Sequence, residues 1–191
     1  MAGVNFNPER VAYFEANGWR AYYDRHWLTL LRLLVALCQE QFHIPFPVSL
    51  QAAYYVTRAS IAWAPRDHDE NVVLRYYRKF YRLARRYSGL TFDPDVVGML
   101  ELQYNDVHRR LSGKPDKTEF IATMIALHSA LFGIAPDAAR ISAEQRVQAN
   151  NTVDLISSKT SSDPAADWQK VEEHLRACYR SIAAHLDTSV D

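Results

Sequence analysis

The sequence predicts an all-α protein, a compact bundle of about eight helices. Apolar residues recur every three or four positions along the chain, which is typical of helices with one buried side. Strict alternation of apolar and polar residues nowhere runs long enough to indicate a sheet. Proline repeatedly follows a capping residue, and only 6 of the 191 residues are glycine. With 48% apolar and 23% charged residues, the chain has the composition of a folded globular protein.

Three helix starts follow from local chemistry, at Asn7-Pro8, Asp93-Pro94 and Asp163-Pro164. Proline loses no hydrogen bond at the first helical position, and the preceding Asn or Asp side chain accepts from a free backbone amide. Pro47, Pro115 and Pro136 are compatible with three further starts. Asn17-Gly18 looks like a helix end, and the position of Asp24 relative to the next helix stays open. The expected helices are 8–17, 19–43, 47–63, 69–88, 94–111, 116–132, 136–157 and 164–187.

The apolar stripes indicate which helices form the core. The clearest one predicts that the helix over 19–43 is a core helix, and similar stripes run through 73–87 and 97–111. A chain of this length usually forms one core, so we expect a single all-helical domain over residues 1–191. The first stripe consists of Trp27, Leu30, Leu31, Leu34, Leu37 and Cys38.

The location of the protein follows from what the sequence lacks. Arg32 interrupts the longest apolar run, so no membrane span is expected. Residues 1–10 have neither the apolar stretch nor the cleavage site of an export signal. Cys38 and Cys178 lie within apolar helical patterns, where cysteine behaves as a small hydrophobic residue. These features predict a cytoplasmic protein.

The net charge is zero, but the two halves of the chain differ. Residues 1–92 carry 12 Lys/Arg and 7 Asp/Glu, and residues 93–191 carry 10 and 15. Opposite charges of this size can hold the halves together or align two copies, and we expect a homodimer. Six basic residues on the expected helix 69–88 could bind phosphate, an anionic membrane or an acidic partner, or simply face solvent. The neutral pI and the absence of a known nucleic-acid recognition motif argue against nucleic-acid binding.

One pattern resembles a metal-binding motif. Glu40 and His43 are three residues apart on one helix face, as in the Glu-x-x-His units of di-iron bundles. Glu15 and Glu101 could supply lone carboxylate ligands, and His108 follows Glu101 by seven residues. The second Glu-x-x-His unit is missing. A histidine in the last turn of a helix also has a structural role, since it can satisfy free carbonyl groups.

Two groups of residues are candidates for ligand binding. Glu101, Asn105 and His108 lie on one helix face beside a core seam that contains Tyr104, and they could line a pocket or a solvated flank. Tyrosines next to arginines could line a cavity for a small anion or a planar ligand, or they could pack the core with polar tips at the surface. The candidate ligand-binding residues are Tyr22, Tyr23, Tyr55, Arg58, Glu101, Tyr104 and His108.

These observations lead to two functional hypotheses. No nucleophile elbow or phosphate-binding loop occurs, so the first is a non-catalytic helical module that binds a protein partner or a small ligand. The alternative is a metal- or haem-dependent enzyme of ferritin-like or haem-oxygenase-like architecture. It would hold iron or haem with Glu40, His43, Glu101 and His108.

Overall fold

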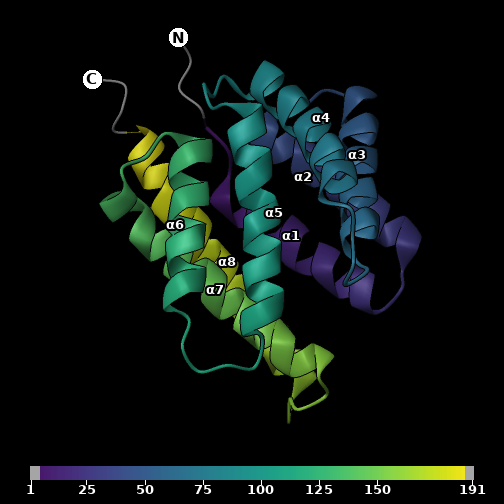
Figure 1. The fold of residues 1–191 in the computed structure, drawn as a ribbon, viewed down its shortest axis with the longest axis vertical. Coiled ribbons are helices and arrows are strands. Elements are labelled where there is room, and N and C mark those ends of the chain that lie inside the picture. The colour runs from purple at the N-terminus through teal and green to yellow at the C-terminus, as the bar shows by residue number, and fades with distance from the viewer. Residues whose placement is uncertain (1–4, 188–191) are drawn as a thin grey trace.

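The structure, a computed structural model, describes residues 5–187 and consists of eight helices (Figure 1). No strand occurs in this part of the chain, so the predicted all-α bundle is confirmed. The helices are α1 (Pro8–Tyr23), α2 (Trp27–Phe42), α3 (Val48–Trp63), α4 (Glu70–Ser88), α5 (Pro94–Leu111), α6 (Thr118–Phe132), α7 (Pro136–Ser157) and α8 (Pro164–Asp187).

The predicted helix starts at 7–8, 93–94 and 163–164 are confirmed, each with the expected capping bond. Asn7 Oδ1 accepts from the amide of Glu9 at 3.0 Å, and Asp93 Oδ1 accepts from the amide of Asp95 at 2.8 Å. Asp163 Oδ1 accepts from the amide of Ala166 at 3.0 Å. Local side-chain chemistry therefore determines these starts, because each cap satisfies an amide that lacks a partner within the helix.

The predicted helix end at Asn17-Gly18 is wrong. The helix α1 continues to Tyr23, and the chain turns at Arg25, which adopts the left-handed conformation with φ 59°. The amide of His26 donates to the carbonyl of Ala21 at 2.8 Å, which closes the helix with a Schellman-type bond. Pro115 likewise does not open the next helix, since α6 begins at Thr118.

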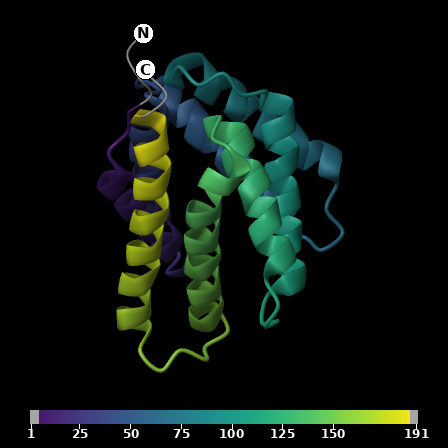
Figure 2. The ribbon, with the colours of Figure 1, turned by 90° about the vertical axis from the view of Figure 1, so that its left-hand side faces the viewer.

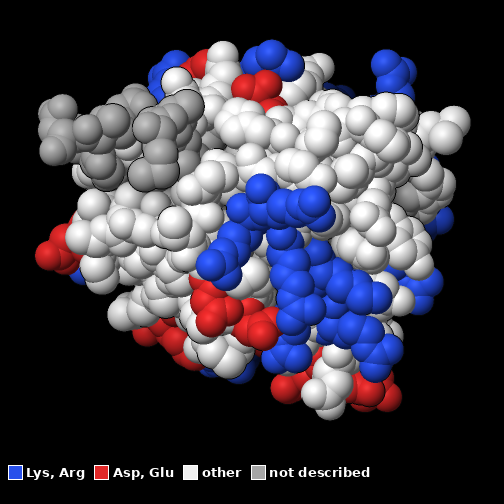
Figure 3. All heavy atoms as spheres, turned by 90° about the horizontal axis from the view of Figure 1, so that it is seen from above, with Lys and Arg blue, Asp and Glu red and all other residues white. Residues whose placement is uncertain are grey.

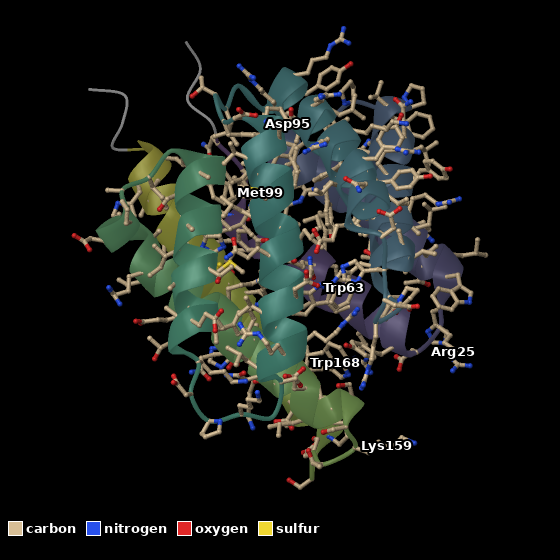
Figure 4. The ribbon with its side chains drawn as sticks, viewed as in Figure 1. Arg25, Trp63, Asp95, Met99, Lys159 and Trp168 are labelled. Atoms are coloured by element: carbon tan, nitrogen blue, oxygen red, sulfur yellow. The ribbon has the colours of Figure 1, made fainter. Side chains whose placement is uncertain are left out.

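The helices form a closed ring in which each helix packs against the next one along the chain, and α8 packs against α1 (Figures 1 and 2). Side chains also connect α3 to α5, where the indole Nε1 of Trp63 donates to Asp106 at 2.8 Å (Figure 4). The Arg109 guanidinium lies 3.5 Å from the centre of the Trp63 ring and donates to the carbonyl of Trp63 at 2.8 Å. The side chains of these helices therefore meet in the interior of the ring.

The prediction that the apolar stripe of α2 makes it a core helix is wrong for its first half. Cys38 and Phe42 are buried, but Trp27 and Leu28 are 57% and 81% exposed. The reason is the position of α2 in the ring, where it contacts α1, α3 and α4 but no helix covers its outer side. An exposed apolar surface therefore remains at the start of α2.

No single helix in residues 5–187 is long and apolar enough to cross a membrane. Only α6 and α7 taken together reach that length and composition, and they are bent by 119° relative to each other. The apolar side of α6 lies in the interior of the ring, where Phe120 and Met124 are at most 1% exposed. Packing in the bundle thus accounts for the high apolar content of α6.

Candidate functional site

A cavity of about 140 Å³ lies between the helices of the ring, and all eight helices contribute to its wall. Leu34, Leu37, Leu127 and Leu131 are among the apolar side chains that line it. A cavity of about 150 Å³ is large enough to bind one benzene molecule. The polar and charged side chains of the wall are Glu15, Gln41, Tyr77, Tyr81, Glu101, Tyr104, His128, Arg146 and Tyr179.

A buried ion pair forms one part of this wall. Nη1 of Arg146 on α7 lies 2.6 Å from Oε2 of Glu15 on α1, and the two side chains are only 13% and 10% exposed. The hydroxyl of Tyr179 on α8 donates to the same carboxylate oxygen at 2.5 Å. The Arg146 guanidinium also lies 4.8 Å from the centre of the Trp19 ring. The first helix and the last two helices of the chain thus position one carboxylate and its counter-ion.

The second carboxyl group of the wall, that of Glu101 on α5, has no such counter-ion. Its Oε2 accepts from the hydroxyl of Tyr81 at 2.9 Å, and among residues 5–187 no Lys, Arg or His nitrogen lies within 4.0 Å of it. Burial raises the pKa of Glu101, although Arg146 and the bond from Tyr81 partly oppose this. Glu101 is therefore a cavity-lining acid that is costly to ionise.

His128 on α6 is a neutral base in the same wall. Its Nδ1 lies 2.8 Å from the hydroxyl of Ser142, and this hydroxyl donates to the carbonyl of Ala139 at 2.8 Å. Because the hydroxyl proton is already used, Nδ1 must donate and Nε2 must be the acceptor. Burial, together with the charge of Arg146, lowers the pKa of His128 to about 3. Its Nε2 makes no hydrogen bond to any residue that the structure describes.

A second polar cluster lies outside the cavity lining and joins α5 to α7. His108 Nε2 lies 3.1 Å from Oδ1 of Asp154, and the Ser112 hydroxyl donates to Oδ2 of the same carboxylate at 2.8 Å. Burial opposes ionisation of Asp154, but these two bonds and Lys117 outweigh it, so its pKa is lowered. The carboxylate lies between the serine and the histidine, which is not the order of a nucleophile, base and orienting acid.

Two of the seven predicted ligand-binding residues line the cavity, Glu101 and Tyr104. His108 lies outside it and stacks on Phe120, with ring centres 5.1 Å apart. Tyr22 and Tyr23 lie at the end of α1 with exposed rings. The remaining two, Tyr55 and Arg58, belong to a group of stacked tyrosines and cations on α3 and α4.

Sequence reasoning missed most of the polar wall, namely Gln41, Tyr81, His128, Arg146 and Tyr179. A signal was present for two of them. Arg146 lies on the buried side of α7 together with Ala139, Ala143 and Asn150, and His128 follows Leu127 within a buried stripe. A charged or ionisable side chain on an otherwise buried helix face indicates a paired or functional group.

The structure gives each of the four predicted metal ligands a separate partner or place. Glu40 pairs with Arg10 at 3.0 Å, His43 ends α2 in the left-handed conformation, and His108 pairs with Asp154. Glu101 alone lines the cavity. In the described part of the chain, no group of three or more His, Cys, Asp or Glu side chains is placed to hold a metal ion.

The basic residues expected on α4 form an exposed face at the surface of the molecule (Figure 3). Arg78 and Arg82 pair with Asp95 at the start of α5, at 3.3 and 3.4 Å. Lys79 lies 5.5 Å from the centre of the Tyr55 ring and 5.8 Å from that of Tyr76. Part of the positive charge is thus neutralised within the fold or stacked on tyrosine rings.

Searches among family models, curated proteins and solved structures find no match to this chain. The cavity is the feature on which all eight helices converge, and it is the candidate functional site of this chain.

Proposed function

We propose that this chain is a non-catalytic helical module that binds one small organic molecule in its central cavity. The observation that carries the proposal is the combination of a benzene-sized space with polar groups that have no partner. Neither the side-chain amide of Gln41 nor Nε2 of His128 makes a hydrogen bond to a described residue. Both side chains line the cavity, so a bound molecule with a polar end would supply a hydrogen-bond partner for these atoms.

A small molecule could enter the cavity between α2 and α3, where the side chains of the wall are partly exposed. Leu34 and Leu37 on α2 and Val56 on α3 line the cavity but are only half-buried. The wall is therefore thin on this side, and α2 is also the helix whose first half is most exposed. Small shifts of these side chains would admit a compact molecule.

Cyclopentanol is a suitable first probe, because its ring is close to benzene in size and its hydroxyl can meet the polar wall. We expect saturable binding in a calorimetric titration. Leu127→Phe fills the cavity and should weaken binding about tenfold or more, since overpacked sites exclude added volume. Leu28→Phe is the matched control on the exposed side of α2 and should bind like the wild type. Equal affinity in both variants would place the probe elsewhere and reject the proposal.

The predicted homodimer belongs to the same proposal, with a second copy of the chain as the partner. The exposed side chains Trp27, Leu28 and Leu31 form an apolar surface at the start of α2, and symmetric association would cover it. Light scattering should give twice the 22.0 kDa mass of the chain, and Leu28→Lys should shift the protein toward monomer. A mass of 22.0 kDa at all concentrations tested would reject the dimer.

A cytoplasmic location is also part of the proposal. It is supported by the two cysteines, which are free and buried.

A further inference from the structure

The two carboxyl groups in the cavity wall differ in how their charge is balanced. Glu15 has Arg146 as its counter-ion, with Nη1 and Oε2 2.6 Å apart. Glu101 has no cation within 4.0 Å among the residues that the structure describes, and its nearest hydrogen-bonding groups, the hydroxyl of Tyr81 and the amide of Asn105, are neutral. A bound cation would supply the missing partner, and a buried carboxylate needs one to be ionised at low cost.

The charges that face the cavity favour a cation over an anion. Glu15 and Arg146 cancel, and His128 is neutral. When Glu101 is ionised, the wall therefore carries one net negative charge. A bound anion would meet two carboxyl groups but only one guanidinium group, and that group is already paired with Glu15. Burial raises the pKa of Glu101, and the charge of Arg146, which is paired with Glu15, opposes this only in part. Four lining tyrosines are uncharged because burial raises their pKa values: Tyr77, Tyr81, Tyr104 and Tyr179.

Aromatic rings surround the remaining space. They come from α2, α4, α5, α6 and α8, and some contact one another, as Phe42 and Phe80 do with ring centres 5.7 Å apart. Aromatic rings attract cations electrostatically and also pack well against apolar groups. A wall of rings with one unbalanced carboxyl group is the arrangement expected for a compact amine. The rings belong to Phe42, Tyr77, Phe80, Tyr81, Tyr104, Phe132 and Tyr179.

We propose that the cavity binds a small amine as its ammonium ion, with Glu101 as the counter-ion. This inference rests on the proposed function, since it specifies the ligand of the same cavity. The size of the space restricts the ligand to an amine whose apolar part is close to benzene in volume. Gln41 and His128 Nε2 remain as acceptors for a further polar group of the ligand.

Three probes separate charge from shape: cyclopentylammonium, cyclopentanol and butyrate. The first two share a ring and differ mainly in the charge of the polar group, and butyrate is a compact anion. In calorimetric titrations at pH 7.5, we expect cyclopentylammonium to bind about tenfold or more tightly than cyclopentanol, because its hydrogen bond to Glu101 is charge-assisted. Butyrate should bind more weakly than both.

Glu101→Gln keeps the shape of the side chain and an oxygen that can accept from Tyr81, but it removes the charge. This variant should lose the preference, so that cyclopentylammonium and cyclopentanol bind to it with affinities within about twofold of each other. Glu119→Gln is the matched control, because Glu119 lies exposed on α6 outside the cavity and its loss changes the net charge equally. It should keep the full preference.

The outcomes distinguish the two proposals. If cyclopentanol binds in the cavity but cyclopentylammonium is not preferred, or if Glu101→Gln keeps the preference, the ammonium ligand is rejected and the small-molecule module stands. Tightest binding by butyrate also rejects the ammonium ligand. If no probe binds, the proposed function fails together with this inference.

Discussion

Arg146→Met is expected to lower the free energy of unfolding by about 3–5 kcal/mol, because it removes one partner of a buried ion pair. The Glu15 carboxylate would keep only the hydroxyl of Tyr179 as a donor in an interior where an unpaired charge is strongly disfavoured. Urea unfolding followed by circular dichroism measures the loss directly.

Two control variants separate the ion pair from the loss of side-chain packing. Arg110→Met removes a surface arginine that pairs with Glu119 and is 51% exposed, and it should cost far less stability than Arg146→Met, because solvent screens an exposed ion pair. The double variant Glu15→Gln/Arg146→Met should recover much of the lost stability, because no buried charge then lacks a partner. If Arg146→Met costs no more than Arg110→Met, the polar wall does not depend on the ion pair.

The second large effect is a loss of folding stability at low pH. The pKa of His128 is about 3 in the folded protein and about 6.5 in an unfolded chain. The unfolded state therefore binds a proton first as the pH falls. The contribution of neutral His128 to the free energy of unfolding is fully present above pH 6.5 and is lost as the pH falls through 3. At about 1.4 kcal/mol for each pH unit of difference, the loss from this one histidine amounts to about 4–5 kcal/mol.

His128→Asn should remove most of this acid sensitivity. The asparagine amide can still donate to the Ser142 hydroxyl, but the variant no longer carries a group that gains a proton on unfolding. Stability measured at several pH values between 3 and 7 should fall less steeply for this variant than for the wild type. His26→Asn, at an exposed position, should keep the wild-type slope. If stability falls equally steeply with pH in His128→Asn and in the wild type, His128 gains its proton as easily in the folded state as in the unfolded state.

Most of the fold could be predicted because its signals are local. The caps at Asn7, Asp93 and Asp163 act within one helical turn, and the apolar stripes identify the helices between them. The turn at Arg25 was missed because a residue other than glycine adopts the left-handed conformation there. The exposure of Trp27 was missed for a different reason, since an apolar stripe shows only that a helix has an apolar side and not that a neighbour covers it.

The candidate site could be predicted only where its residues share one helix. Glu101 and Tyr104 were found together because both lie beside the core seam of α5. The wall opposite them combines Glu15, Arg146 and Tyr179 from three helices that meet only in the folded ring. Each of these residues is unremarkable in its own segment, so the contact between them is a property of tertiary packing.

The most direct test of the account uses the two methionines that the structure describes. Met124 lines the cavity and is 1% exposed, whereas Met99 lies on α5 with 52% of its surface exposed (Figure 4). Their methyl signals can be followed by NMR during a titration with cyclopentylammonium. If the ligand binds in the central cavity, the Met124 signal shifts to saturation while the Met99 signal stays in place. A static Met124 signal, or a shift of Met99 alone, would contradict ligand binding in the central cavity.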